Sequence, residues 1–356
     1  MGRTYIIAEA GVNHNGDISL AKELILAAAD AGADAVKFQT FKAEKLASKK
    51  APKADYQNKT TDSKESQLDM LRKLELPLDA YTELMALCEE KGIEFLSTPF
   101  EEDSLRFLVN ECQLKLMKIP SGEITNAPFL LAVARTKLPI IISTGMSTLG
   151  DIENVLMVLS FGYLESGEPL GKEAFLKAYI KANENGILHD KVKLLHCTTE
   201  YPAPFSEVNL NAMDTMRQAF GLEVGYSDHT EGIAIPMAAV ARGAKIIEKH
   251  FTLDKSMPGP DHKASLDPDE LKAMVTGIRQ IEKAIGNGIK VPADSELSNI
   301  SIVRKSLVAS KPIKKGEIIS KDNIAIKRPG NGKSPMNYWD ILGQNAAKDY
   351  MEDELI

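Results

Sequence analysis

Cysteine is scarce in this sequence, and its spacing excludes two common uses of the residue. The 356 residues include three cysteines, Cys88, Cys112 and Cys197. An odd number of cysteines without a CxxC pair indicates neither a disulfide framework nor a structural zinc site. We therefore expect a cytoplasmic protein, because thiols stay reduced in that compartment.

Positive charge and long apolar runs are lacking as well. The 43 Lys and Arg residues are outnumbered by 50 Asp and Glu residues, which gives a formal net charge of −7. This balance disfavours nucleic-acid and anionic-membrane partners, because both require a positive surface. No apolar run approaches the ~18 residues of a membrane-spanning helix, and the N-terminal residues lack the pattern of a signal peptide. We expect no nucleic acid and no membrane among the partners, and local cations around any anionic substrate.

Short apolar or β-branched runs alternate with longer amphipathic stretches before residue 255. This alternation is typical of βα units and a parallel sheet, and eight such units make a (βα)8 barrel. We therefore predict an α/β fold, a TIM barrel over residues 1–285. The predicted strands are 4–8, 35–39, 94–97, 115–119, 139–143, 193–196, 223–226 and 245–250.

Two polar inserts and a change of pattern interrupt this alternation of predicted strands and helices. The insert at 45–66 follows the end of a strand, on the face where barrel enzymes carry their chemistry, so it could act as a lid. The insert at 165–190 is expected to decorate the outside. Glycines and a proline predict a linker over 286–300. Residues 301–356 mix short alternating runs with turn residues, which predicts a small β-rich domain.

Polar residues follow nearly every predicted strand, at the end where barrel enzymes place catalytic groups. Lys37 and Lys118, with the hydroxyls of Ser121, Ser143 and Ser227, would supply the cations and donors that a phosphate requires. One such residue alone would more often cap a helix or face solvent. A group of them from several strand ends favours an anion site.

Histidine and glutamate at other strand ends suggest metal and acid–base chemistry. His229 and His250 can converge on one divalent ion, with water and substrate completing an open shell. A histidine at a strand end is also commonly a polar group whose hydrogen bonds are made within the protein. The residues therefore leave open whether His229 and His250 bind a metal. Glu9 and Glu123 are acid–base candidates, although Glu9 could equally pair with a lysine in the barrel mouth. For Cys197, a buried thiol is expected rather than a nucleophile.

Ordered motifs spread over nearly the whole chain resemble those of the bacterial sialic acid synthase family. In that family a TIM barrel precedes a small β-rich antifreeze-like (SAF, β-clip) domain. The motifs are AEAGVNHNG at 8–16, VKFQT at 36–40, STPF at 97–100, KIPSGE at 118–123, STGM at 143–146, HCTTEYP at 196–202, SDHT at 227–230, EKHF at 248–251, PGPDH at 258–262 and KRPGNG at 327–332.

The resemblance implies a metal-dependent condensation of phosphoenolpyruvate with an N-acetylated amino sugar. C3 of phosphoenolpyruvate would attack the open-chain sugar aldehyde, and phosphate would leave. Glu9 and Glu123 would be the acid–base groups, while His229 and His250 would bind Mn2+, or else Mg2+ or Co2+. Phosphoenolpyruvate would be held by Lys37, Thr98, Lys118, Ser121, Ser143 and Ser227, and the sugar by Gln39, Tyr201, Asp261 and Arg328.

Arg328 would reach the site of a partner subunit in a domain-swapped homodimer, according to the same resemblance. N-acetylmannosamine is the favoured acceptor, which makes the chain an N-acetylneuraminate synthase. The alternative is a synthase of legionaminic or another nonulosonic acid that uses a 2,4-diacetamido-trideoxy sugar, because Thr199 stands where some sialic acid synthases have Asn. A pyruvate aldolase would not need the phosphate-binding set, and the polar strand ends disfavour a purely ice-binding protein.

Overall fold

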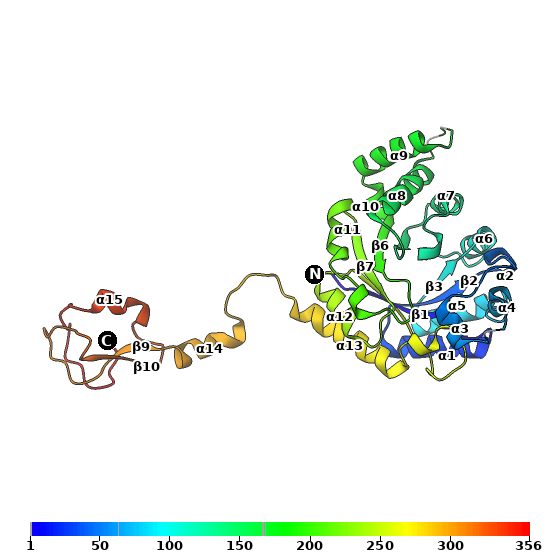
Figure 1. The fold of residues 1–356 in the computed structure, drawn as a ribbon. Helices are drawn as coiled ribbons and strands as arrows, with labels where there is room; N and C mark the ends of the chain where they lie inside the picture. Colours follow the sequence, from blue (N-terminus) through cyan, green and yellow to red (C-terminus); the bar gives the residue numbers. More distant parts are fainter. Residues whose placement is uncertain (1, 63, 166, 168) are drawn as a thin grey trace. The chain divides into compact units, whose positions relative to one another are not determined.

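The structure of the protein is a computed structural model that describes residues 2–62, 64–165, 167 and 169–356 (Figure 1). The chain divides between residues 286 and 287 into two compact units. Ser63, Ser166 and Glu168, which fall in the two predicted inserts, lie outside the described residues. Each unit is described by itself.

A closed sheet of eight strands forms the centre of the first unit. The strand order is β3-β2-β1-β8-β7-β6-β5-β4, neighbouring strands pair in parallel, and β3 also lies beside β4. The predicted (βα)8 barrel is therefore confirmed. The strands are β1 (Tyr5–Gly11), β2 (Ala35–Thr40), β3 (Glu94–Pro99), β4 (Met117–Ile119), β5 (Ile140–Ser143), β6 (Val192–Cys197), β7 (Glu223–Asp228) and β8 (Ile246–His250).

Several strands run further than predicted, always past the point where the sequence turns polar. β1 continues to Gly11 and β7 to Asp228, because their polar residues still pair with neighbours. Glu9 is in register with His250 across β1 and β8. Polar side chains at these positions therefore belong to regular strands that face one another, and not to separate loops.

Helices surround the sheet (Figure 1). The first, α1, begins after Asp17, whose side chain accepts hydrogen bonds from two backbone N–H groups, and ends at Gly32 with φ of 80°. Its buried face packs with the outward side chains of the strands. The surrounding helices are α1 (Ile18–Ala31), α5 (Ala80–Lys91), α6 (Glu102–Asn110), α7 (Ala127–Arg135), α8 (Leu149–Leu164), α11 (Ala212–Phe220), α12 (Ala234–Ala241) and α13 (Pro268–Ala284).

Both inserts carry short helices of their own. The first insert extends beyond its predicted bounds of 45–66 to the whole segment between β2 and α5, which contains α2 (Ala43–Leu46), α3 (Asp55–Thr60) and α4 (Gln67–Arg72) and lines the pocket of the barrel. The second contains α9 (Lys172–Glu184) and α10 (Ile187–Lys191), which pack beside α8 on the outside of the barrel. Across the described residues, no helix has the length and apolar character needed to cross a membrane.

The second unit is a small domain around two antiparallel strands, as predicted for a β-rich domain. These are β9 (Ser306–Ala309) and β10 (Ile324–Lys327), followed by the short helix α15 (Tyr338–Ile341). The predicted linker over 286–300 is helical in its second half. The helix there is α14 (Asp294–Val303), which begins two residues after Pro292. The Glu296 carboxylate accepts the Ala293 N–H at the helix start, a local contact that glycine and proline counts do not reveal.

Candidate active site

The barrel interior changes from apolar to polar toward the C-terminal ends of the strands. Ile7, Leu96 and Ile141 belong to a buried layer inside the barrel. Side chains on a strand return to the same face every second residue, so the next interior layer comes two positions later. That layer holds Glu9, Lys37, Thr98, Lys118, Ser143, Cys197, Ser227 and Glu248.

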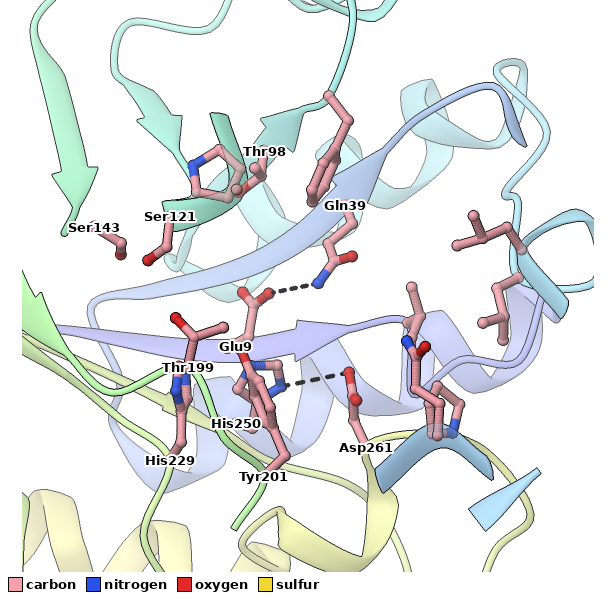
Figure 2. Close-up of a pocket in the computed structure, with 18 of the residues that line it drawn as sticks. Glu9, Gln39, Thr98, Ser121, Ser143, Thr199, Tyr201, His229, His250 and Asp261 are labelled. Atoms are coloured by element: carbon pink, nitrogen blue, oxygen red, sulfur yellow. Dashed lines mark hydrogen bonds and ion pairs between the residues drawn. The ribbon is translucent and has the colours of Figure 1, made fainter. Parts of the chain in front are cut away.

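This polar layer forms the floor of a cavity of about 390 Å³ at the barrel mouth, a volume suited to small substrates. The structure brings most of the predicted site residues to this one pocket, as Figure 2 shows for many of them. The hydroxyls of Ser121 and Ser143 lie on one side of Glu9, and Gln39 and Asp261 lie on the other. The predicted residues in its lining are Glu9, Lys37, Gln39, Thr98, Lys118, Ser121, Ser143, Tyr201, Ser227, His229, His250 and Asp261.

Two lysines and two glutamates form a buried network on this floor. Lys37 Nζ lies 2.5 Å from Glu9 Oε2 and 3.6 Å from Glu248 Oε2, and it donates to Thr98 Oγ1 at 3.0 Å. Lys118 Nζ lies 3.4 Å from Glu248 Oε1. The pairing of Glu9 with a lysine, one of the two roles considered from the sequence, is therefore present.

Hydroxyl groups extend this network toward one side of the pocket. Lys118 Nζ donates to Ser143 Oγ at 2.8 Å, and Ser227 Oγ donates to Glu248 Oε1 at 2.8 Å. The Gly145 N–H donates to Ser121 Oγ at 2.9 Å, and a Cβ at this glycine would lie 2.1 Å from Thr199 Oγ1. The turn after β5 thus requires glycine. Cations and donors of this kind can hold an anion.

The two buried glutamates have different proton affinities. Burial raises the pKa of Glu9 above its ordinary value, and the nearby Lys37 cation only partly opposes that effect. Burial acts on Glu248 in the same direction, but Lys118 and Lys37 together hold the pKa of Glu248 below its usual range. Glu9 can therefore hold a proton more readily, while Glu248 stays ionised between the two lysines.

The histidine pair lies beside this network with the properties of neutral metal ligands. The rings of His229 and His250 have centroids 5.6 Å apart. His229 Nδ1 donates to the Thr198 carbonyl oxygen at 2.6 Å, which leaves Nε2 with a free lone pair. His250 Nδ1 is buried without a hydrogen-bond partner among the described residues. Burial lowers the pKa of both imidazoles, and neutral imidazole is the form that binds metals.

These two imidazoles fit a divalent ion whose shell is completed from outside the protein. Within the described residues no group of three or more His, Cys, Asp and Glu side chains forms a closed metal site. The Asp261 carboxylate lies beside the pair, with Oδ2 3.9 Å from His250 Nδ1 (Figure 2). An ion held by two histidines would keep positions for water and substrate, as a catalytic Lewis acid requires.

The residues predicted to contact the sugar lie next to the histidines. Gln39 Nε2 donates to Glu9 Oε1 at 3.3 Å, and the Tyr201 ring lies 4.2 Å from the His229 ring, centroid to centroid. Burial raises the pKa of Asp261 to about 6. An amide, a phenol and a carboxyl group therefore surround the space in front of the histidine pair.

Glu123 lies outside this pocket lining, and Arg328 belongs to the second unit. Glu123 is in the 3-10 turn η1 (Ser121–Glu123), is partly exposed, and accepts a hydrogen bond from Asn126 Nδ2 at 2.7 Å. The pocket lining that the structure describes does not include it. Arg328 lies in the second unit directly after β10, where its exposed side chain donates from Nε to the Val303 carbonyl oxygen at 3.0 Å.

The sequence analysis missed Glu248, which links both lysines to Ser227. The signal was available, because Glu248 lies two residues before His250 on one strand and therefore points into the same barrel interior. It also missed the apolar side chains that the first insert adds to the lining. Cys197 is buried, with Sγ 3.2 Å from Ser121 Oγ, and burial raises the pKa of its thiol, so a packed thiol is the better interpretation.

Comparison with known proteins assigns the chain to a family. The NeuB family matches residues 24–290, and the SAF domain matches residues 304–356. The N,N'-diacetyllegionaminic acid synthase of Campylobacter jejuni is 57% identical over 100% of this chain and 99% of its own length. The enzyme of the same name from Legionella pneumophila is 47% identical over 95% of this chain and 89% of its own length.

A solved structure agrees with this assignment. The N-acetylneuraminic acid (sialic acid) synthetase of Leptospira borgpetersenii, in complex with citrate, has a TM-score of 0.66 at 33% identity and covers 84% of this chain and 90% of its own. The pocket described above and these matches lead to one conclusion: the chain belongs to the NeuB family of sialic acid synthases, phosphoenolpyruvate-dependent condensing enzymes, and carries a C-terminal SAF domain.

Proposed function

We propose that the protein is an N,N'-diacetyllegionaminic acid synthase, which condenses phosphoenolpyruvate with a 2,4-diacetamido-trideoxy sugar and releases phosphate. The observation that carries this proposal is the 57% identity, over the whole chain, to the Campylobacter jejuni enzyme of that name. The sequence analysis favoured N-acetylmannosamine as the acceptor. The comparisons support the alternative acceptor better, since relatives with that activity in their names match at 57% and 47% identity.

Phosphoenolpyruvate is assigned to the side of the pocket that holds the hydroxyl groups. Lys118 Nζ and Ser143 Oγ lie 2.8 Å apart there, with Ser121 close by. A phosphate and a carboxylate can take these lysine and hydroxyl groups as partners, because each anionic oxygen needs a cation or a donor. Thr98, Ser227 and Lys37 complete this part of the proposed site.

The sugar aldehyde is assigned to the histidine side. A divalent ion on His229 and His250, Mn2+ in the first instance, would polarise the aldehyde oxygen when bound. Gln39, Tyr201 and Asp261 would orient the open-chain sugar so that its C1 faces C3 of phosphoenolpyruvate. A bond then forms between these two carbons, and the aldehyde oxygen takes up a proton.

Water and Glu9 are assigned to the second half of the reaction. Water adds at C2 of the former phosphoenolpyruvate, and phosphate leaves as the bond between C2 and its bridging oxygen breaks. Glu9, next to Lys37 and Gln39 on the pocket floor, is placed to orient that water and accept its proton. The lysines stabilise the charge on the departing phosphate.

A phosphate-release assay over a panel of acceptors tests the function. The panel is N-acetylmannosamine, its 6-phosphate and a 2,4-diacetamido-trideoxy sugar, each with phosphoenolpyruvate and Mn2+. We expect the diacetamido sugar to give the highest kcat/KM. A higher kcat/KM with N-acetylmannosamine would instead assign N-acetylneuraminate synthesis, the second candidate, which the likeness to the Leptospira enzyme supports.

Assembly and compartment are part of the proposal. We propose a domain-swapped homodimer in which Arg328 reaches the partner subunit's sugar site, because it lies beside a Pro-Gly turn beyond an exposed connecting segment. The cytoplasm is the proposed compartment. Three buried cysteines without disulfides are compatible with its reducing conditions.

A further inference from the structure

The pocket has a second, apolar side that the mechanism above does not use. Apolar side chains of the first insert line it, and Val12 and Phe100 adjoin them. We call this set the insert wall; it consists of Leu46, Ala47, Met70, Leu71 and Leu74.

The insert wall packs as a small core of its own. Met70 and Leu74 are buried together with Val12 and Phe41, and Leu71 packs against this cluster. The rings of Phe41 and Phe100 meet edge to face in the same cluster. Close packing of this kind gives the wall a definite shape, which a selective surface needs.

Polar contacts hold the insert in place over the pocket. The buried Lys53 donates from Nζ to Thr61 Oγ1 at 2.9 Å and to the Asp62 carbonyl oxygen at 2.5 Å, which ties the insert to itself. Thr60 Oγ1 lies 3.1 Å from the Tyr56 carbonyl oxygen and 3.3 Å from the Pro260 carbonyl oxygen, next to Asp261. The insert therefore contacts the loop that carries a proposed sugar contact.

The wall lies on the side of the pocket where the far end of the sugar would extend. The hydroxyls of Ser121 and Ser143 lie on one side of Glu9, and Gln39 lies on the other (Figure 2). β2 runs from Gln39 directly into the insert. A sugar whose aldehyde faces the histidine pair therefore directs its remaining carbons away from the phosphate side and toward the wall.

Charge on this side of the pocket disfavours an anionic substituent. Within the described residues, the lysines and arginines of the lining are Lys37 and Lys118, and both are paired with glutamates on the floor. A sugar phosphate facing the insert wall would find no unpaired cation in the described lining of this barrel, which is unfavourable for a buried anion. A hydroxyl group there would lose its hydrogen bonds to water against Leu71 and Leu74.

Amide groups at the edge of the wall suit a different substituent. Gln57 and Gln67 line the same pocket, and Gln57 uses its Oε1 to accept the Ala54 N–H at 3.0 Å. Its Nε2 can therefore donate to a carbonyl oxygen in the pocket. A donor beside an apolar surface is the environment that an acetamido group requires for its carbonyl and its methyl.

We propose that the insert wall selects the acceptor sugar. It favours uncharged, methyl-bearing groups at the far end of the sugar, a second acetamido group and a deoxy carbon, and it disfavours acceptors with a 6-hydroxyl or a 6-phosphate. This inference rests on the proposed function and names the residues that give it its specificity. Leu71 is the best single probe, because it lines the pocket and is only partly buried.

Leu71→Asn tests the wall with a matched control at a second leucine. We expect kcat/KM for the diacetamido sugar to fall roughly ten- to hundredfold, with a much smaller change for N-acetylmannosamine and an unchanged KM for phosphoenolpyruvate. Leu149→Asn, at a leucine 41% exposed at the start of α8 and away from this pocket, should leave the preference between the two sugars unchanged. Leu71→Lys should raise kcat/KM for N-acetylmannosamine 6-phosphate, because it adds a cation.

The outcomes separate the wall from the function on which it rests. If the wild-type enzyme uses the diacetamido sugar and both Leu71 variants keep its preference, the wall proposal is wrong and the proposed function stands. A wild-type preference for the 6-phosphate or 6-hydroxyl sugar would overturn both proposals. Should Leu71→Asn fold poorly by circular dichroism, Leu71→Ser and Leu46→Asn repeat the test at the same wall, and an unchanged preference in them would equally overturn it.

Discussion

The pocket floor and the insert wall are two halves of one site, built by different means. The floor consists of charged and polar side chains on barrel strands, each held by neighbours in register, such as Glu9 opposite His250. The wall consists of apolar side chains on short helices between β2 and α5, anchored by a few contacts. Strand positions hold groups precisely for chemistry, whereas an insert can change its surface without disturbing the barrel. We therefore expect floor variants to lose turnover and wall variants to change the choice of sugar.

Removing the metal or one of its proposed ligands should have the largest effect. EDTA should abolish phosphate release, and Mn2+ should restore it. His250→Ala should retain the fold but lose nearly all turnover at any Mn2+ concentration, because one imidazole remains. His189→Ala, at a strongly exposed histidine on α10, is the matched control. Full activity of His250→Ala after chelation would contradict the metal assignment.

Removing a lysine of the floor should have the next largest effect. Lys118→Met keeps much of the side-chain volume but leaves Glu248 without its nearer lysine partner. We expect kcat/KM for phosphoenolpyruvate to fall roughly 10²- to 10³-fold, with KM for the sugar little changed. Lys115→Met replaces an exposed lysine just before β4 and should behave as wild type. Equal losses for both substrates would show that Lys118 supports the fold and not the phosphate.

The two glutamates predicted as acid–base groups should differ. Glu9→Gln changes a buried group of the floor, and we expect kcat to fall by about 10² or more. Glu123→Gln changes a partly exposed group that pairs with Asn126, and we expect less than a tenfold loss. Single-turnover assays with the purified variants measure both. Similar losses of kcat for the two variants would show that Glu123 takes part in the reaction.

The exchange of C-terminal domains should give a modest change in a single variant and a clear test in mixtures. Arg328→Ala should lower kcat/KM for the sugar by about tenfold, as the loss of a charged hydrogen bond would. If Arg328 acts on the partner subunit, refolding Arg328→Ala together with His250→Ala should produce heterodimers with one intact site. Confirmed heterodimers without recovered activity would place Arg328 outside the partner's site.

Much of the floor was predictable from strand position alone. Lys37, Thr98 and Ser143 each follow an apolar strand residue by two positions. Because side chains on a strand return to the same face every second residue, this spacing places all three inside the barrel mouth, independently of the surrounding helices. Glu248 obeys the same rule, since it follows the buried Ile246 by two positions. The barrel itself followed from the alternation of strands and helices.

Other features depended on the folded chain. Glu123 follows Ser121 by two residues, yet the 3-10 turn sets its side chain beside Asn126, because a turn does not keep the period of a strand. In the sequence, the spacing of Leu71 and Leu74 indicates only the apolar face of an amphipathic segment. They line the site because the insert folds back over the mouth and contacts the loop at Pro260. The sequence determined the barrel and the polar ends of its strands, since both follow from local periodicity. Tertiary structure alone decided which apolar residues meet the substrate, because that contact joins segments far apart in the chain.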